Sequence, residues 1–400
     1  MTTPATDPTR SASATRVAPV TRVAIVGCGI IGKHHARVLS RHPAFTVTAL
    51  VDPDPAATEA AAAVLAEERA PAAKAFTDLD QAVGGADVDL VAIATPSGMH
   101  VGHGRQALAL GKHVVIEKPL DVDLAAARAF AEAVKAAPDQ RVSVISQHRF
   151  DPANIVVKQA VDAGRLGTIT SGQAATTWYR SKSYYDAADW RGTWAMDGGA
   201  VLNQGVHTVD LLRWLLGVPV SIYAQADHRG HAFLEVEDTA AATVRFENGA
   251  IATILATSSA YPGLTTRVTI GGTGGATVVE NDRLGFFYAG RSEDAGTTNT
   301  LAPESGPRDQ SADMVDQANR VGAAPDAQGF VNGHHRQYDD IAAALAEGRD
   351  PGVTVDEALL SLALVRGIYV SATLGRPIEF ADLLNGDYDD VVPDLDGRTA

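Results

Sequence analysis

The chain has 400 residues, of which 46% are hydrophobic and 20% are charged, and its net charge is −15. A chain of this length is too long to fold around one ordinary hydrophobic core, so we expect a globular protein of two domains. The acidic balance argues against nucleic acid or an anionic membrane surface as the main partner, because both are bound by clustered Lys and Arg.

The sequence also bears on location. The single cysteine, Cys28, cannot form an internal disulfide, so an oxidising compartment is not indicated. The predicted helices lack the run of about eighteen or more apolar residues typical of a membrane span. Residues 1–20 are rich in Thr, Ala and Pro and lack the apolar core of a signal peptide. We expect a disordered tail over 1–20 and a cytoplasmic protein.

Apolar runs alternate with helical stretches from residue 21 to residue 147. This alternation predicts an α/β Rossmann domain, in which helices cover a doubly wound parallel sheet. The predicted strands are 23–26, 47–51, 90–94, 114–116 and 142–145. The predicted helices are one that ends near residue 41, followed by 56–69, 100–110 and 124–136.

The pattern changes after residue 147, where strands follow one another without intervening helices. They predict an α+β domain over 148–380 with an open, mostly antiparallel sheet. Its predicted strands are 169–178, 220–227, 240–247, 250–258, 265–271 and 276–280, and its helices are 155–163, 200–216, 334–346 and 356–373. Residues 290–329 are rich in Gly, Pro, Asp and Ser and predict a long surface loop. Residues 381–400 predict a loose acidic tail.

A GxGxxG motif, GCGIIG at 27–32, follows the first strand and begins a helix. The glycines allow a tight turn, a close backbone approach to a pyrophosphate and helix-on-strand packing, while the helix N-terminus attracts phosphate. In this context the motif predicts a dinucleotide site. Its predicted phosphate-binding residues are Gly27, Gly29, Ile30, Ile31 and Gly32.

Asp52 ends the second strand, twenty residues after Gly32. A carboxylate at this place accepts hydrogen bonds from the adenosine ribose hydroxyls and repels a 2′-phosphate. The alternative is a turn residue before Pro53. Since neither Arg nor Lys lies nearby in the sequence, we expect NAD as the cofactor in preference to NADP.

Four segments resemble the glucose–fructose oxidoreductase, inositol dehydrogenase and rhizopine catabolism (Gfo/Idh/MocA) family, over residues 22–380. They are GCGIIGKHHA at the first glycine turn, ATPSGMH at 94–100, GKHVVIEKPL at 111–120 and GGAVLNQGVHTVDLLRWLLG at 198–217. The resemblance implies a Rossmann domain followed by a domain with an open sheet that often mediates dimers or tetramers. We therefore expect a homodimer or homotetramer.

The resemblance assigns cofactor and catalytic roles around the Glu117-Lys118-Pro119 motif. It implies that Lys118 binds a substrate hydroxyl and takes part in proton transfer, that Glu117 lies near the nicotinamide ribose, and that a cis peptide precedes Pro119. An ammonium at a strand end suits stabilisation of a developing alkoxide. Further cofactor contacts are expected from Thr95, Pro96, Ser97, His100 and Gln147. For His100, a polar residue at a helix start is the alternative.

His207 matches the catalytic histidine of the family, and an imidazole suits proton transfer with a hydroxyl. Asn203 lies four residues earlier and is expected on the same helix face, with Asp210 nearby. Many family members carry Asp where this chain has Asn203, so we expect Lys118 and His207 to share the proton relay while Asn203 positions the substrate. The LNQGVH variant resembles the branch that acts on pyranose rings, which includes nucleotide-sugar 3-dehydrogenases.

Other polar residues complete the predicted pocket. Arg149 either binds a substrate oxygen or pins the domain junction. The loop from 179 to 191 suits a sugar ring or a phosphate, with a loop anchor or subunit contact as the alternative; its aromatic and basic residues are Tyr179, Arg180, Lys182, Tyr184, Tyr185, Trp190 and Arg191. His334 and His335 have no ligand pattern of metal-site spacing around them, so we expect no metal.

Together these features predict an NAD(H)-dependent oxidoreductase that acts on a CH–OH group of a carbohydrate such as a pyranose, glycoside or nucleotide sugar, possibly at C3. An inositol dehydrogenase is one alternative. A second is a glycosidase or lyase that uses NAD to form a transient keto-sugar, distinguished by whether NADH accumulates. A non-catalytic NAD-binding sensor is disfavoured, because both Lys118 and His207 are present.

Overall fold

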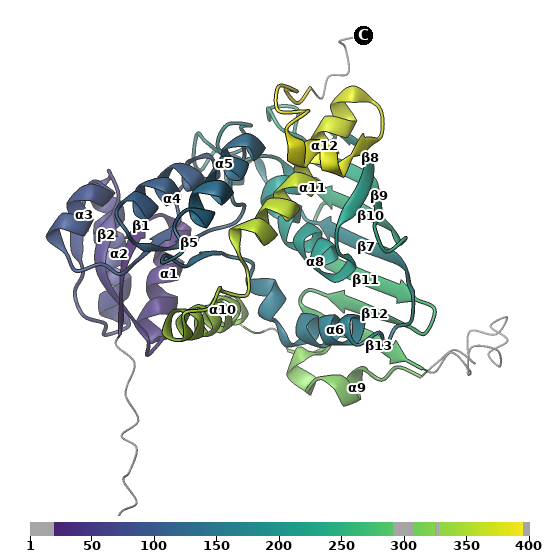
Figure 1. Cartoon of the computed structure of the whole chain (residues 1–400), viewed down its shortest axis with the longest axis horizontal. Coiled ribbons are helices and arrows are strands. Elements are labelled where there is room, and N and C mark those ends of the chain that lie inside the picture. The colour runs from purple at the N-terminus through teal and green to yellow at the C-terminus, as the bar shows by residue number, and fades with distance from the viewer. Residues whose placement is uncertain (1–19, 291–307, 325, 327, 395–400) are drawn as a thin grey trace, which may run out of the picture.

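The computed structural model describes residues 20–290, 308–324, 326 and 328–394. It contains two sheets side by side, each with helices packed against it (Figure 1). The first sheet lies in the N-terminal half and the second is formed by later strands, as the change of pattern near residue 147 predicts. The fold class predicted from the sequence is confirmed.

The first sheet has six parallel strands in the order β3-β2-β1-β4-β5-β6. The strands are β1 (Thr21–Val26), β2 (Phe45–Val51), β3 (Lys74–Phe76), β4 (Leu90–Ile93), β5 (His113–Ile116) and β6 (Val142–Val144). The helices are α1 (Ile30–Arg41), α2 (Pro55–Glu67), α3 (Leu79–Gly85), α4 (His100–Ala109) and α5 (Leu124–Lys135). The central strands β1 and β4 are buried on both faces, which explains their continuous apolar runs.

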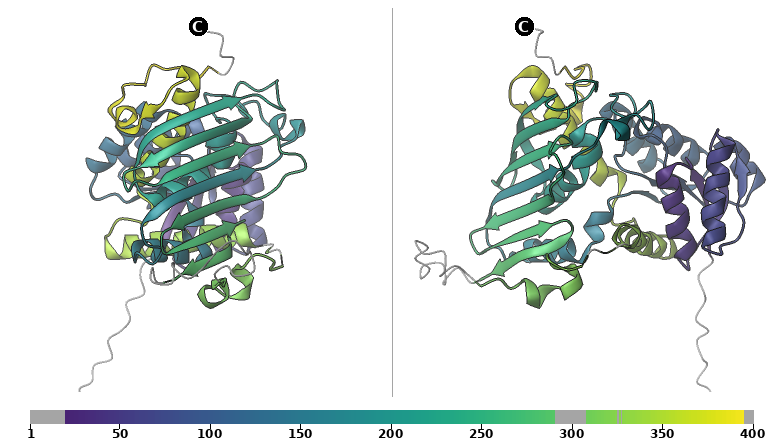
Figure 2. Two further views of the ribbon diagram at one scale, coloured as in Figure 1. Left: turned by 90° about the vertical axis from the view of Figure 1, so that its right-hand side faces the viewer. Right: turned by 180° about the vertical axis from the view of Figure 1, so that it is seen from behind.

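The second sheet has eight strands in the order β13-β12-β11-β7-β10-β9-β8-β14. All neighbouring pairs are antiparallel except β7 and β10, which run parallel. The strands are β7 (Ile169–Thr177), β8 (Pro219–Asp227), β9 (Thr239–Phe246), β10 (Ile251–Thr257), β11 (Thr266–Gly272), β12 (Gly275–Glu280), β13 (Arg283–Ala289) and β14 (Ile378–Glu379). Helices pack on one face, and Figure 2 shows the other face uncovered within this chain.

Two long helices, α10 and α11, connect the two halves. The helices of this part are α6 (Pro152–Asp162), α7 (Lys182–Tyr185), α8 (Val206–Leu216), α9 (Ser311–Met314), α10 (Gly329–Glu347), α11 (Val355–Leu374) and α12 (Phe380–Asn385). α8 packs against β7, α11 contacts α5, α8 and β8, and α10 returns to pack against α1 of the first half. Side chains from both halves therefore meet beside the carboxyl ends of the parallel strands.

α11 is the one helix, among the described residues, that is long and apolar enough to cross a membrane by length and composition. In the fold, 61% of its most apolar window is buried. Its hydropathy is that of a core helix between two sheets.

Two predicted loops are partly wrong. The segment predicted as a surface loop over 290–329 contains α9, and α10 begins at Gly329 rather than near residue 334; residues 291–307 lie outside the described part. The predicted tail begins with α12, and Asp389 forms an ion pair with Arg128. α12 packs on α11 and β8, and the backbone N–H of Asp394 donates a hydrogen bond to Thr373 of α11. Residues 395–400, like residues 1–19, lie outside the description.

Candidate active site

The glycine turn between β1 and α1 has the geometry that its predicted phosphate-binding role requires. Gly27 has φ +88°, and a Cβ there would lie 2.7 Å from the backbone carbonyl carbon of Ala94. A Cβ on Gly32 would lie 1.9 Å from the oxygen of Gly27. Nothing lies within 4 Å of the Cβ position of Gly29, and the neighbouring Ile30 is 71% exposed. The backbone is therefore open to an approaching pyrophosphate.

Asp52 connects the end of β2 to this turn. Its carboxylate accepts hydrogen bonds from the backbone N–H of Cys28 at 2.8 Å and of Asp54 at 2.9 Å. Each carboxylate oxygen retains a further lone pair. Asp52 can therefore hold the turn and still accept hydrogen bonds from a ribose.

Two other predicted cofactor contacts carry buried polar atoms without partners. The Oγ1 of Thr95, after β4, and the Oε1 of Gln147, after β6, have no hydrogen-bond partner in the part of the chain that the structure describes. Because buried polar atoms are nearly always hydrogen-bonded, such atoms fit groups that bind a ligand. Pro96 and Ser97 continue the β4 loop into a short 3-10 turn (Ser97–Met99).

His100 is buried between two loops of the first half, and its predicted cofactor contact stays a prediction. The residue is 1% exposed, and its two ring nitrogens lie 2.7 Å from the oxygen of Pro119 and 2.9 Å from that of Thr95. It therefore joins the loops that follow β4 and β5. The peptide bond between Lys118 and Pro119 is cis, as the family resemblance implies.

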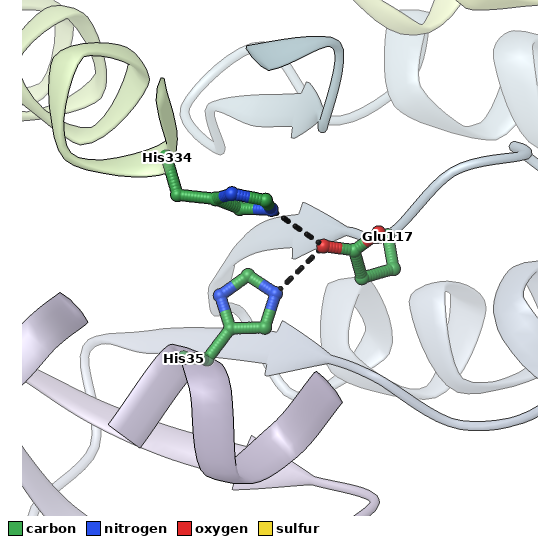
Figure 3. A group of neighbouring side chains, drawn as sticks. All are labelled: His35, Glu117 and His334. Atoms are coloured by element: carbon green, nitrogen blue, oxygen red, sulfur yellow. Dashed lines mark hydrogen bonds and ion pairs between the residues drawn. The ribbon is translucent and has the colours of Figure 1, made fainter. Parts of the chain in front are cut away.

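Glu117 is buried between α1 and α10 (Figure 3), and its expected place near the nicotinamide ribose stays a prediction. Its Oε1 lies 2.9 Å from Nε2 of His35 on α1 and 3.2 Å from Nε2 of His334 on α10, while Oε2 accepts the backbone N–H of Lys118. Burial favours the neutral acid, yet hydrogen bonds from the two imidazoles hold the pKa of Glu117 well below its usual range. Glu117 thus fixes the backbone of Lys118.

His334 and His335 have no metal-ligand pattern near them in the sequence, but the fold places other potential metal ligands beside each of them. His334 lies with His35 and Glu117, and His335 lies with His42 and Asp339. Local spacing could not indicate these groups, because Glu117 is 217 residues from His334. The outer nitrogens of the first group bond to the Phe330 carbonyl and the Tyr338 hydroxyl. Hydrogen bonds account for this geometry, and the expectation of no metal stays a prediction.

Lys118 follows β5 and faces the second domain. Its Nζ donates a hydrogen bond to the backbone oxygen of Asn203 at 3.3 Å, and it lines a small cavity together with His207 and Ser146. Burial lowers the pKa of Lys118, and the nearby carboxylates of Glu117 and Asp197 oppose this shift. The ammonium therefore gives up its proton more readily than a surface lysine.

The predicted helix over 200–216 begins with a π-helical turn, η3 (Ala200–Gly205), and continues as α8. The carboxylate of Glu237 accepts the backbone N–H of Val201 at 2.8 Å at the start of this turn. The wider turn directs the side-chain amide of Asn203 to Asp197. Within the described residues, Asn203 makes no hydrogen bond to His207, and its expected role in positioning the substrate stays a prediction. Such π-turns often occur at functional sites.

His207 lies against a second histidine that the sequence analysis did not assign to the site. The rings of His207 and His148 are 4.7 Å apart at 83°. His148 Nδ1 lies 2.9 Å from Asp282 and 3.0 Å from Asp151; although burial opposes its charge, these carboxylates raise the pKa of His148 to about 10. Burial, Lys118 and the charged His148 hold the pKa of His207 well below 6.5. His207 is therefore a neutral imidazole, ready to accept a proton.

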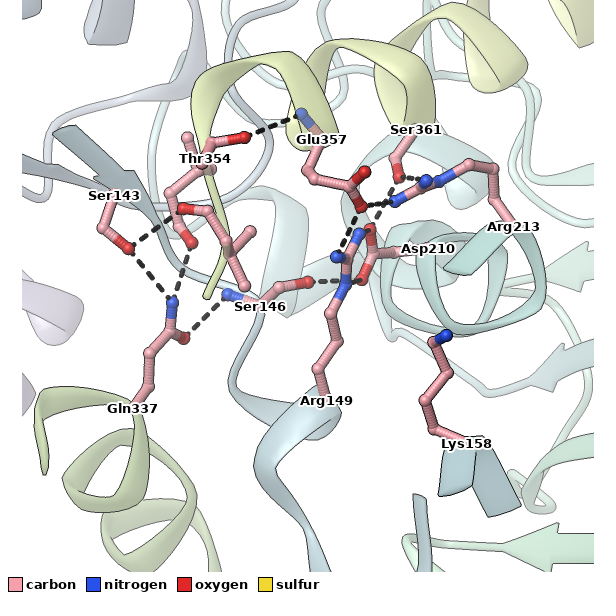
Figure 4. Close-up of polar contacts among 12 residues, drawn as sticks. Ser143, Ser146, Arg149, Lys158, Asp210, Arg213, Gln337, Thr354, Glu357 and Ser361 are labelled. Carbon is pink, nitrogen blue, oxygen red and sulfur yellow. Dashed lines mark hydrogen bonds and ion pairs between the residues drawn. The ribbon is translucent and has the colours of Figure 1, made fainter. Parts of the chain in front are cut away.

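Arg149 belongs to the domain junction, and its predicted substrate contact is wrong (Figure 4). Its Nε and Nη2 donate to Asp210 at 2.7 and 2.6 Å, and its Nη1 donates to Glu357 at 2.9 Å. The residue is 3% exposed, so the fork is occupied and closed to a ligand. These contacts fit the alternative, in which Arg149 connects η2 (Gln147–Phe150) to α8 and α11 at the domain junction.

The loop over 179–191 lies partly beside Lys118. The positive charges of Arg180 and Arg191 contribute to lowering the pKa of Lys118. Arg191 also stacks on Trp190, with its Cζ atom 4.8 Å from the ring centroid. Tyr179 packs at a different place, with its ring 5.1 Å from that of Tyr261. Two basic residues of the loop therefore lie near the predicted catalytic lysine, whereas Tyr179 packs against Tyr261.

Comparisons with known proteins identify the family of this chain. The family model for the oxidoreductase family with an NAD-binding Rossmann fold matches residues 21–146, and the GFO/IDH/MocA C-terminal domain matches residues 155–278. Inositol 2-dehydrogenase of Rhizobium meliloti is 30% identical over 66% of this chain and 76% of its own length.

Two solved structures with a bound nicotinamide cofactor are similar to this chain. The WlbA dehydrogenase from Bordetella pertussis, in complex with NADH and UDP-GlcNAcA, has a TM-score of 0.77 and 30% identity, with 90% of this chain and 98% of that chain covered. GenD2 from gentamicin A biosynthesis, in complex with NAD, has a TM-score of 0.72 and 26% identity, with coverage of 90% and 96%. The Rossmann half is an NAD-binding domain, and the chain belongs to the Gfo/Idh/MocA family of oxidoreductases.

Proposed function

We propose that this NAD-dependent oxidoreductase transfers hydride between the nicotinamide and a secondary alcohol or ketone of a sugar-like substrate. The observation that carries the proposal is the shared cavity of Lys118 and His207, at the carboxyl end of β5. The two groups have complementary tendencies, since His207 is held neutral and Lys118 releases its proton more easily than usual. A hydroxyl between them meets both a donor and a base.

The proton path follows from these groups. When bound, NAD supplies the hydride acceptor and NADH the donor. Lys118 donates a hydrogen bond to the substrate oxygen and favours the developing alkoxide, while His207 accepts the hydroxyl proton. In the reverse direction His207 returns the proton to the oxygen of the ketone. The backbone oxygen of Asn203 aims the Lys118 ammonium.

The substrate is a pyranose, glycoside or nucleotide sugar in this proposal, with C3 as the reacting carbon. The WlbA dehydrogenase, crystallised with a nucleotide sugar, supports this class. Inositol is the second candidate, because inositol 2-dehydrogenase is among the similar relatives. The uncovered face of the second sheet supports the expected homo-oligomer, and the expected cytoplasmic location stays a prediction (Figure 2).

The direct test is a substrate panel. The purified enzyme is incubated with NAD and free sugars, inositols, glycosides or nucleotide sugars, and NADH formation is followed by absorbance. We expect at least one carbohydrate class to support turnover. If all are inactive and the corresponding keto compounds also fail to oxidise NADH, the proposed reaction is wrong.

We propose NAD as the preferred cofactor because of the Asp52 carboxylate. Calorimetric titration of the wild-type enzyme is expected to give a lower Kd for NAD than for NADP, and the Asp52→Ala variant should narrow this difference because it removes the charge that repels a 2′-phosphate. Asp54→Ala is the matched control, since Asp54 caps α2 through Ala56. Tighter binding of NADP by the wild-type enzyme would contradict the assignment.

A further inference from the structure

Two half-buried arginines, Arg180 and Arg191, lie beside the proposed hydride-transfer centre and pack against aromatic rings. The Cζ atom of Arg191 lies 4.2 Å from the ring centroid of Tyr184, and the Cζ atom of Arg180 lies 5.2 Å from the same centroid. Arg180 also lies over Trp178, at 4.9 Å. Aromatic contacts fix the planes of the guanidinium groups but leave their charges in place.

Neither guanidinium has a carboxylate within ion-pair distance among the residues that the structure describes. The Nε atoms of both Arg180 and Arg191 are buried and lack a hydrogen-bond partner within that same set of residues. Other arginines at the domain junction differ, since Arg149 and Arg213 are each paired with acids. In a chain with 48 acidic and 33 basic residues, this lack of acids marks a local excess of positive charge.

The carboxylate of Asp197 interacts electrostatically with both Arg191 and Lys118, but its hydrogen bonds go to other groups. One of its carboxylate oxygens accepts the Gly192 N–H at 2.7 Å, and the other accepts the side-chain amide of Asn203. Burial raises the pKa of Asp197. Among the described residues, Asp197 therefore occupies none of the N–H donors of Arg180 and Arg191.

The arginine pair is linked to Lys118 through adjacent residues of η3. Asn203 offers its carbonyl oxygen to Lys118, while Gln204 accepts a hydrogen bond from Nη2 of Arg180 at 2.8 Å and donates one to the Tyr184 hydroxyl at 3.2 Å. Consecutive Cα atoms are about 3.8 Å apart. A single bound molecule can therefore reach the arginines and the proposed hydride-transfer centre.

We infer that Arg180 and Arg191 bind a carboxylate carried by the sugar substrate, so that the enzyme acts on uronic-acid-type sugars in preference to neutral ones. Guanidinium groups present flat forks of N–H donors that match the two oxygens of a carboxylate, and the buried Nε atoms would gain the acceptors that they lack. This inference rests on the proposed function and names its substrate class.

The experiment compares matched sugars on matched variants. The probes are the methyl glycosides of glucuronic acid and glucose, and UDP-glucuronic acid and UDP-glucose. The variants are Arg180→Gln and Arg191→Gln, with Arg267→Gln as the control, because Arg267 is an exposed sheet residue paired with Glu280. Turnover is measured with NAD, and sugar binding is measured by calorimetry on the NADH-saturated enzyme.

We expect the wild-type enzyme to favour the carboxylated member of at least one pair. Each pocket variant should lower kcat/KM or affinity for that sugar by roughly 10- to 100-fold, the scale of a lost charged hydrogen bond, mainly through KM, with little change for the neutral member. NAD affinity and the Arg267→Gln variant should be unchanged.

Two results would overturn the inference. One is equal loss for both members of a pair, and the other is the absence of arginine-dependent binding of either carboxylated sugar. Loss confined to both UDP-sugars would assign the arginines to the diphosphate and likewise reject the carboxylate. If the carboxylated sugar binds through the arginines without hydride transfer, the inference stands and the proposed function fails. If only neutral sugars are turned over, the proposed function stands and the inference fails.

Discussion

The variants Lys118→Met and His207→Ala are each expected to lose kcat by roughly 10²-fold or more, the scale of a positioned acid or base. Lys118→Met keeps the length of the side chain and removes the ammonium that favours an alkoxide. His207→Ala removes the neutral imidazole that accepts the proton. Steady-state kinetics with the active substrate of the panel measure both effects.

Controls separate chemistry from folding in this experiment. Both variants should retain the thermal unfolding midpoint and the NAD affinity of the wild-type enzyme, since neither residue holds the glycine turn. Lys135→Met is the matched control, because Lys135 is 55% exposed on α5 and pairs with surface acids. Nearly unchanged kcat in Lys118→Met or His207→Ala would remove that residue from the proton relay.

The pH–rate profile provides a second readout of the same prediction. The pKa of His207 is held well below 6.5 by burial, Lys118 and His148. A base with a lowered pKa stays deprotonated as the pH falls, until the pH reaches that lowered value. The acidic limb of the profile for oxidation is therefore expected below the usual histidine range, and an acidic limb at or above that range would contradict the role of His207.

The Asp210→Ala variant is expected to lower the free energy of unfolding by roughly 3–5 kcal/mol, the cost of breaking a buried ion pair. Asp210 is 5% exposed and accepts two hydrogen bonds from Arg149 and others from Ser146 and Ser361 (Figure 4). Removing the carboxylate leaves a buried guanidinium with reduced compensation. Chemical denaturation measures the loss.

Asp356→Ala is the control for this substitution. Asp356 is 62% exposed at the start of α11, and its contact with Lys135 is a surface pair at 3.7 Å, so its loss should cost at most about 1 kcal/mol. An Asp210→Ala variant no less stable than this control would show that the junction does not depend on the ion pair.

The contribution of Asp210 to stability also has a defined pH dependence. Burial favours the neutral acid, yet Arg149 and Arg213 hold the pKa of Asp210 below its ordinary value. A group with a lowered pKa in the folded state contributes fully above the unfolded-state pKa of about 3.9 and less as the pH falls below it. The difference between wild type and Asp210→Ala should therefore shrink in acid.

The sequence predicts the fold well where periodicity is strong. The apolar runs of β1 and β4 and the regular spacing of α5 and α11 identify these elements with small errors at their ends. The strands β3, β13 and β14 and the helix α3 were missed. β3 has three residues that are mostly exposed, so neither an apolar run nor a clear alternation marks it. Helical π-turns share the hydrophobic pattern of α-helices, which is why η3 was predicted as part of one helix.

The site was predictable only as far as motifs reach. Lys118 and His207 carry family patterns, and the structure brings them to one cavity. His148 was missed, because the carboxylate of Asp282 that charges it lies in a distant turn of the second sheet. Arg149 and Glu117 were given ligand roles, although partners from α8, α11, α1 and α10 occupy their polar atoms. Local spacing contains no information about such long-range partners.

Transfer of deuterium tests the central claim most directly. The enzyme is incubated with NAD and an active sugar that is deuterated at the carbon to be oxidised, and the nicotinamide and the sugar product are examined by mass spectrometry. The account predicts deuterium on NADH in an amount equal to the keto-sugar formed, and roughly 10²-fold slower transfer in Lys118→Met. A sugar product that forms while NADH does not accumulate, with the deuterium returned to the product or lost, would contradict a net dehydrogenase and would favour a reaction in which NAD is recycled within each turnover.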